Sequence, residues 1–235
     1  MANVRLRLTP RNMTDLVWQQ CLENIEPELD TVKARLKEIF QTCETTRAQM
    51  DYNTGSITFS AALALYLLTR QIQPTCIFEV GTFIGKSTLA MALAIDHNGN
   101  DGRIYTCDGS NDFHLPKISK CQIKGFSKTT STNALAAVTQ ANVRLDMMHI
   151  DGRLTAQDLD LIEKIADPRI VIALDDFEGM EKGVANLSMI RGRPFFAQHA
   201  LIYPMSQTMI AQLGCHTGNT TALLLPMGGF TFTWQ

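Results

Sequence analysis

Short apolar runs alternate with amphipathic segments along most of the chain. The runs predict strands at 76–80, 103–107, 121–126, 143–150, 170–174, 199–203 and 221–225. Helical spacing of apolar residues predicts helices between them, at 87–95, 133–140, 155–166 and 181–190. Strands and helices that alternate in this way indicate an α/β fold. We expect a doubly wound, mostly parallel seven-stranded sheet with helices on both faces, a Rossmann-like arrangement.

The first 50 residues have a different pattern. Two helical stripes of apolar residues, interrupted at Pro27, predict helices between about 13 and 50. We therefore divide the chain into an N-terminal helical extension, 1–50, and a main domain, 51–235. The stripes suit either a lid on the main domain or a contact with a second subunit, so a homodimer stays open. After a loop at 51–56, a buried helix is expected from Ile57 to Gln71, with Ser56 as its N-cap.

Composition excludes several classes of protein. The chain has 235 residues, 45% hydrophobic residues and a net charge of −2, which suits a folded core and gives no sign of a nucleic-acid-binding face. Its longest apolar stretch, 57–68, is too short for a membrane span. Six cysteines without C-x-x-C spacing, and a start without a secretory signal, favour a reduced cytoplasmic protein. We expect no nucleic-acid or membrane partner.

The end of the first strand carries a glycine-containing turn, the kind of site that binds ligands in such sheets. A dinucleotide fold would place a glycine where Phe83 stands. A P-loop needs four residues before Gly-Lys-Ser, whereas three separate Gly81 from Gly85. A nucleotide triphosphatase nevertheless stays open as an alternative, because 170–176 could pass for a Walker B strand. The third ligand class is S-adenosylmethionine, whose acidic-x-Gly-x-x-x-Gly loop fits Glu79, Gly81 and Gly85.

An acidic residue also ends the second strand. Asp108 follows Gly85 by 23 residues, about one strand–helix–strand step. A carboxylate there can accept hydrogen bonds from both hydroxyls of a ribose and would be a poor neighbour for a triphosphate. The alternative is that Asp108 only starts a turn with Gly109 and Ser110.

The stretch from Glu79 to Thr88, E-V-G-T-F-I-G-K-S-T, resembles motif I of class I S-adenosylmethionine-dependent methyltransferases. It is closest to the branch with catechol, caffeoyl-CoA and macrolide-sugar O-methyltransferases. Weaker matches follow at 149–152, 174–176, 125–127 and 52–56, so the resemblance covers roughly 50–235. It implies a Rossmann-like methyltransferase fold and these cofactor-binding residues: Thr54, Gly55, Glu79, Gly81, Thr82, Phe83, Gly85, Ser87, Asp108, Ser127 and Asp151.

Three carboxylates, Asp151, Asp175 and Asp176, end two strands that should be adjacent. Carboxylates that converge repel one another unless they are protonated or bridged by a cation, and oxygen ligands favour Mg²⁺ or another divalent ion. The resemblance implies the same three metal ligands, with Asp151 as the catalytic residue. The metal would bind the acceptor's oxygen and lower its pKa. The alternative is that one of them caps a helix and the others line a polar cleft without metal.

The general base of relatives is missing. Their His or Lys, shortly after the fourth-strand Asp, corresponds here to Leu154, beside Arg153, which stays protonated. His114, His149 and His199 are weak substitutes, Lys86 is expected to be solvated, and Lys182 either touches an acceptor or decorates a helix. The leading hypothesis is a metal-assisted O-methyltransferase for a small-molecule acceptor. A non-catalytic cofactor-binding module is a further alternative.

Overall fold

The computed structural model describes residues 10–23, 25–48, 54–110, 113 and 115–227. Their seven-stranded sheet has the order β3-β2-β1-β4-β5-β7-β6. The strands are β1 Cys76–Val80, β2 Arg103–Asp108, β3 Gln122–Ser127, β4 Leu145–Ile150, β5 Ala166–Leu174, β6 His199–Ile202 and β7 Ala222–Pro226. Strands β1 to β5 pair in parallel, and β7 is antiparallel to both β5 and β6. The doubly wound, mostly parallel sheet predicted from sequence is confirmed.

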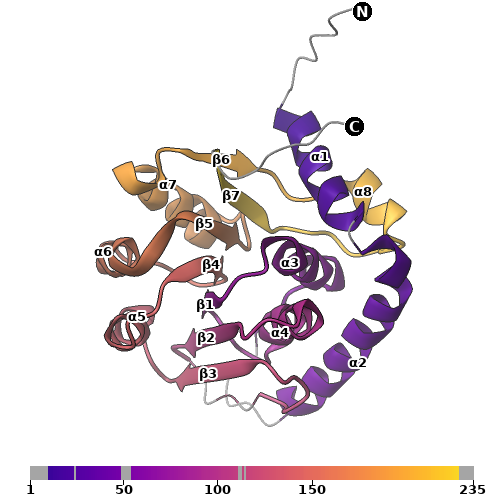
Figure 1. The fold of residues 1–235 in the computed structure, drawn as a ribbon, viewed down its shortest axis with the longest axis horizontal. Helices are drawn as coiled ribbons and strands as arrows, with labels where there is room; N and C mark the ends of the chain where they lie inside the picture. Colours follow the sequence, from indigo (N-terminus) through magenta and orange to yellow (C-terminus); the bar gives the residue numbers. More distant parts are fainter. Residues whose placement is uncertain (1–9, 24, 49–53, 111–112, 114, 228–235) are drawn as a thin grey trace, which may run out of the picture.

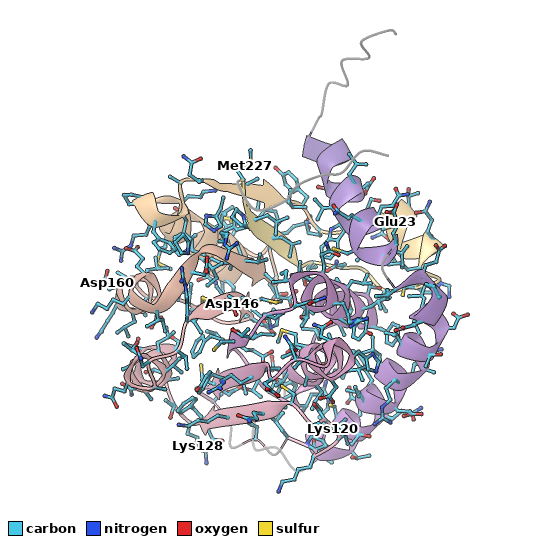
Figure 2. All side chains as sticks on the ribbon, viewed as in Figure 1. Glu23, Lys120, Lys128, Asp146, Asp160 and Met227 are labelled. Carbon is cyan, nitrogen blue, oxygen red and sulfur yellow. The ribbon has the colours of Figure 1, made fainter. Side chains whose placement is uncertain are left out.

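Helices cover both faces of this sheet (Figure 1). On one face lie α3 Phe59–Ile72 and α4 Lys86–Asn98, and on the other α5 Ser131–Gln140, α6 Ala156–Ile165 and α7 Ala185–Arg191. Side chains of successive strand residues point to opposite faces, so Ile77 and Met147 join the first apolar cluster and Phe78 and Met148 join the second. Figure 2 shows side chains filling the space between the sheet and both helix layers.

The N-terminal helices form an outer layer beyond α3 and α4 (Figure 1). Helix α1 spans Pro10–Glu23 and α2 spans Leu29–Arg47, with a short 3₁₀ turn at Glu26–Glu28 where Pro27 interrupts the helical pattern. Their apolar stripes are buried against this same chain: Trp18 and Leu36, for example, are fully buried in the cluster that includes α3 and α4. The stripes thus have a partner within the chain, and both the homodimer and the division at residue 50 stay predictions.

Local details differ from the sequence predictions in three places. Helix α3 begins at Phe59, and its N-cap is Thr58, whose hydroxyl accepts from the Ala61 amide, so the expected Ser56 cap is wrong. The chain passes directly from α6 into β5, which is longer than expected. The expected helix 181–190 is split into a π-helical turn, Met180–Val184, followed by α7.

The remaining short elements are the 3₁₀ turn Pro194–Phe196 and α8 Gln207–Gln212. The chain reaches α8 through a connection in which Ser206 caps the helix by accepting from the Met209 amide. None of the described helices combines the length and the apolar character that crossing a membrane requires.

Candidate functional site

A cavity of about 870 Å³ opens at the carboxyl ends of the central strands. This is where ligands bind in doubly wound sheets, and the size is within the usual range for a small-molecule site. Residues from distant parts of the sequence form its wall: 54–58, Val80, Gly81, Phe83, 107–110, 129–132, 151–153, Thr155, Asp175, Asp176, Lys182 and Thr220. Eight of the predicted site residues therefore meet here: Thr54, Gly55, Gly81, Phe83, Asp108, Asp151, Asp175 and Asp176.

The glycine loop forms one side of this cavity. Gly81 has φ +96°, and a Cβ there would lie 2.6 Å from the Asp151 carbonyl oxygen, so only glycine allows the ends of β1 and β4 to approach this closely. Gly85, φ +83°, is the N-cap of α4, and a side chain there would collide with Leu115. The glycines are thus explained by the backbone path that brings the loop beside Asp151.

Asp108 connects the loop to the second strand. Its Oδ2 accepts a hydrogen bond from the Phe83 amide at 2.8 Å, and its Oδ1 accepts one from the Ser110 amide at 2.8 Å. Asp108 therefore does start a turn with Gly109 and Ser110. Each carboxylate oxygen can accept more than one hydrogen bond, and Asp108 lines the cavity, so the same carboxylate can also bind a ligand's hydroxyls.

Glu79 lies behind the loop instead of at the cavity wall. The residue is fully buried and accepts hydrogen bonds from the hydroxyls of Thr88 and Thr106, the latter at 2.6 Å. Its Oε1 lies 3.1 Å from His149 Nδ1. Burial alone would raise the pKa of Glu79, but the hydrogen bond and charge of His149 hold it below its usual value. Burial likewise opposes the charged form of His149, while Glu79 raises the pKa of that imidazole.

Four more predicted cofactor residues do not line the cavity. Thr82 is buried, with its hydroxyl 2.5 Å from that of Thr106. Gly85 turns the chain, Ser87 is buried in the first turn of α4, and Ser127 lies at the end of β3, where its hydroxyl accepts from the Phe113 amide at 3.5 Å. Contact of these residues and of Glu79 with a cofactor stays a prediction. Tyr52, Asn53 and His114 lie outside the described residues.

Sequence reasoning missed the polar run 129–132, which lines the cavity next to Asp108. The Thr129 amide donates to the Asp108 carbonyl at 3.1 Å, and Thr130 caps α5 by accepting from the Asn133 amide. The signal was present as a Thr-Thr-Ser-Thr run after the third strand. The hydroxyls of Thr129, Ser131 and Thr132 donate within the protein, to the Ser127 carbonyl and to the Asp158 carboxylate, so what they offer a ligand is acceptor oxygens.

Asp151, Asp175 and Asp176 meet at the opposite side of the cavity, as predicted. The Asp175 amide donates to the Ile150 carbonyl at 3.0 Å, which aligns the ends of β4 and β5. Burial and the charge of Asp175 raise the pKa of Asp151 to about 6, although His149 and Lys182 act in the opposite direction. Asp151 is therefore a carboxylate that can take up a proton near neutral pH.

A lysine lies between two of these carboxylates. Lys182 Nζ is 3.1 Å from Asp151 Oδ1 and 3.1 Å from Asp176 Oδ2. Burial acts to lower the pKa of Lys182, but the two carboxylates raise it above its usual value. The ammonium is thus held in its charged form. Sequence analysis named Lys182 without assigning it to the site, because it did not predict the π-helical turn that directs this side chain inward.

The donor set does not fit a divalent metal. Asp175 Oδ1 accepts from the hydroxyls of Thr220 and Thr221, at 3.1 and 2.8 Å, and Lys182 bridges the other two carboxylates. Among the described residues no group of three or more His, Cys, Asp or Glu side chains is arranged to hold an ion. Lys182 is the cation in contact with two of these carboxylates, Asp151 and Asp176.

Leu154, at the position where the resemblance implies a His or Lys, does not line the cavity. Leu154 is buried in the apolar cluster under α5 and α6, and its amide donates to Asn186 Oδ1 at 3.0 Å. Arg153 points to Glu181, with both side chains mostly exposed. His199 is buried against the Ile170 carbonyl in β5, so it offers no substitute.

Lys86 is not solvated, which corrects the sequence prediction. It is buried, and its Nζ donates to Glu44 Oε1 at 2.6 Å and to Ser56 Oγ at 2.9 Å. Arg47 joins the same group by donating to the Thr54 carbonyl at 2.7 Å and to Ser56 Oγ at 3.0 Å. We call Glu44, Arg47, Ser56 and Lys86 the α2–α4 clamp. It fastens the segment that passes along the cavity, 54–58, to both helices.

Comparison with known proteins supports a single family. Residues 78–177 match the model of a methyltransferase domain. The Bacillus cereus O-methyltransferase in complex with SAH is 14% identical, with a TM-score of 0.55 over 90% of this chain and 97% of that chain. The O-methyltransferase TomG from Streptomyces achromogenes, involved in tomaymycin synthesis and solved with SAM, is 16% identical, with a TM-score of 0.54 over 94% and 100%.

A methyltransferase from Geobacter sulfurreducens is 16% identical, with a TM-score of 0.51 over 91% of this chain and 97% of that chain. At these identities the solved structures show a shared fold. No curated protein sequence matches the chain. The methyltransferase resemblance drawn from the glycine loop is confirmed by the family model, which begins within β1 and ends just after Asp176.

Proposed function

Since residues 78–177 match the model of a methyltransferase domain, we propose that this protein transfers the methyl group of S-adenosylmethionine to an oxygen atom of a small molecule. The observation that carries the proposal is the cavity itself. One continuous wall joins the glycine loop, Asp108 and the Asp151–Asp176 edge. The structural relatives solved with SAM or SAH support the choice of cofactor.

Each part of the wall has a role in binding the cofactor. Asp108 accepts hydrogen bonds from the two ribose hydroxyls, and the polar run 129–132 lies beside the base. The loop at Gly81 and Phe83 contacts the methionine part, which places the methyl group near Asp151. The segment 54–58 covers the cofactor from the side of α2.

The transfer is an in-line displacement. A lone pair of the acceptor oxygen attacks the methyl carbon, the C–S bond breaks, and its electron pair stays on sulfur, giving S-adenosylhomocysteine. The proton of the acceptor hydroxyl passes to the Asp151 carboxylate, which takes it most readily above a pH of about 6. Much of the rate comes from holding oxygen, carbon and sulfur in line.

The assistance by Mg²⁺ predicted from sequence is not part of this mechanism, because Lys182 occupies the place between Asp151 and Asp176 where an ion would bind. A nucleotide triphosphatase is not favoured either. Its phosphate-binding lysine would be Lys86, which does not line the cavity and whose Nζ donates to Glu44 and Ser56. Neither the family model nor the structural relatives support that alternative.

A non-catalytic module is the second candidate, because the relatives' base is replaced by the buried Leu154. Asp151 supplies an acid–base group from another position, which favours the enzyme. The deciding experiment is transfer of labelled methyl from S-adenosylmethionine to a panel of catechols, phenolic acids and sugars, in EDTA and in Mg²⁺. We expect labelled product with wild-type protein and at least a 100-fold lower kcat for Asp151→Asn.

The exposed Asp101→Asn is the matched control and should retain full activity. Binding of the cofactor without methyl transfer to any acceptor in the panel would favour the non-catalytic module over the enzyme.

A further inference from the structure

Lys182 is held in the cavity by a specific backbone turn. It belongs to the five-residue π-helix Met180–Val184, a rare element that frequently occurs at functional sites. Within the turn Met180 and Val184 are exposed and Glu181 contacts Arg153, whereas Lys182 lines the cavity. The turn therefore selects one polar side chain and directs it inward.

The backbone around Asp176 fixes this turn. Asp176 has φ +49°, a left-handed conformation that is unfavourable for a non-glycine residue. Its carbonyl accepts from the Gly179 amide at 2.7 Å, and any side chain at Gly183 would collide with that same carbonyl and with Phe177. The chain tolerates strain at Asp176 and requires glycine at 183, and together these bring Lys182 back to the acidic edge.

We propose that the Lys182 ammonium is the fixed cation of the acceptor site, where it contacts the acceptor oxygen and takes the place of a divalent metal. The inference rests on the proposed methyl transfer and names the residue that makes it independent of metal. Within the described residues the ammonium has two partners, the carboxylates of Asp151 and Asp176. One of its three N–H donors therefore stays available for an acceptor oxygen.

This placement explains how the acceptor is activated. As the oxygen loses its proton to Asp151 and attacks the methyl carbon, the nearby ammonium stabilises the negative charge that develops on the oxygen. The C–S bond electrons leave with sulfur, so Lys182 itself neither gains nor loses a bond. The ammonium also reduces the repulsion between Asp151 and Asp176, which would otherwise need an external cation.

The first test needs no known acceptor. Mn²⁺ binding is measured by electron paramagnetic resonance for wild type, Lys182→Ala and Lys182→Met, with the exposed Lys164→Ala as matched control. We expect wild type and the control to show no Mn²⁺ binding in the millimolar range. Both Lys182 variants should bind Mn²⁺ at least 10-fold more tightly than wild type. Adding Asp151→Asn to either variant should remove this binding. Equal Mn²⁺ affinity in wild type and Lys182→Ala would overturn the proposal, and so would the absence of binding in every variant.

Titration with S-adenosylhomocysteine separates this proposal from the one it rests on. The Lys182 variants should bind it within about threefold of wild type, which also shows that they fold. Failure of wild type to bind S-adenosylhomocysteine would refute the proposed function. The Mn²⁺ measurement would still test whether Lys182 occupies the position of a divalent ion. With an acceptor in hand, Lys182→Ala should lose at least 100-fold in kcat in EDTA. Unchanged kcat would overturn the assignment.

Discussion

At the scale of single residues, Asp108 joins the glycine loop to the end of β2 and lines the cavity. Asp108→Ala removes the carboxylate that we propose accepts from two ribose hydroxyls, and hydrogen bonds to charged groups contribute about 1.5–3 kcal/mol each. We expect S-adenosylhomocysteine to bind at least 10-fold more weakly in calorimetry. Asp101→Ala is the control. Asp108→Asn, which keeps one carbonyl oxygen, should be intermediate, and full affinity in Asp108→Ala would refute the ribose role.

Glu79 is fully buried and paired with His149, so a change there should act on stability. Glu79→Ala leaves the fully buried His149 without its charged partner, and breaking a buried pair of this kind costs about 3–5 kcal/mol. Urea unfolding should show a loss of this order, whereas Glu23→Ala, on the exposed side of α1, should change little. A loss below about 1 kcal/mol would contradict the pairing.

The same pair predicts a pH dependence of stability. The folded state lowers the pKa of Glu79, so its contribution is present at neutral pH and is lost as the pH falls below the value of about 4.3 in the unfolded chain. The folded state raises the pKa of His149, so that contribution is lost as the pH rises through the folded value. Acid destabilisation should be smaller in Glu79→Ala than in wild type. Parallel curves for the two proteins would argue against an ionised Glu79.

Sequence alone identified these residues but not all of their roles. The spacing of Glu79, Gly81 and Gly85 predicts the loop because a tight turn needs glycine at fixed positions. Whether a carboxylate faces the cavity or the core depends on which side of the strand packs on α4, and spacing does not show this. The structure was needed to show that Glu79 is buried in the core while Asp108 lines the cavity.

At the scale of elements, the α2–α4 clamp sets the position of the segment 54–58. Lys86→Met removes two charge-assisted hydrogen bonds from a buried site and leaves Glu44 and Ser56 without that partner. We expect a lower melting temperature and several-fold weaker S-adenosylhomocysteine binding, measured by thermal unfolding and calorimetry. The exposed Lys164→Met should match wild type. If Lys86→Met unfolded earlier yet bound with full affinity, the clamp would be structural only.

Element boundaries were predictable where local chemistry decides them. The predicted helix at 155–166 is found as α6, and the capping box of Thr155 and Asp158 begins it, with both hydrogen bonds within four residues. The N-cap of α3 was not predictable in this way. The Ser56 hydroxyl oxygen accepts from Arg47 and Lys86, and Thr58 caps the helix instead. The π-helical turn at 180–184 depends on contact with the Asp176 carbonyl, which helical periodicity does not reveal.

At the scale of the whole molecule, the sheet order explains why the site forms. The chain reverses direction of winding between β1 and β4, so the loops after both strands diverge and leave a cavity at their carboxyl ends. Alternating strands and helices made this topology predictable. The outer layer of α1 and α2 was predicted as helical. Contact of this layer with a second subunit is a prediction that the mass in light scattering tests.

The most direct measurement is calorimetric titration of wild type and Asp108→Ala with S-adenosylhomocysteine, and of wild type with ATP and Mg²⁺. We predict binding of S-adenosylhomocysteine by wild type, at least 10-fold weaker binding by Asp108→Ala, and no binding of ATP. Binding of ATP with Mg²⁺, together with no binding of S-adenosylhomocysteine, would contradict the proposed function. It would favour the alternative that the loop at Gly81–Ser87 binds the phosphates of a nucleotide.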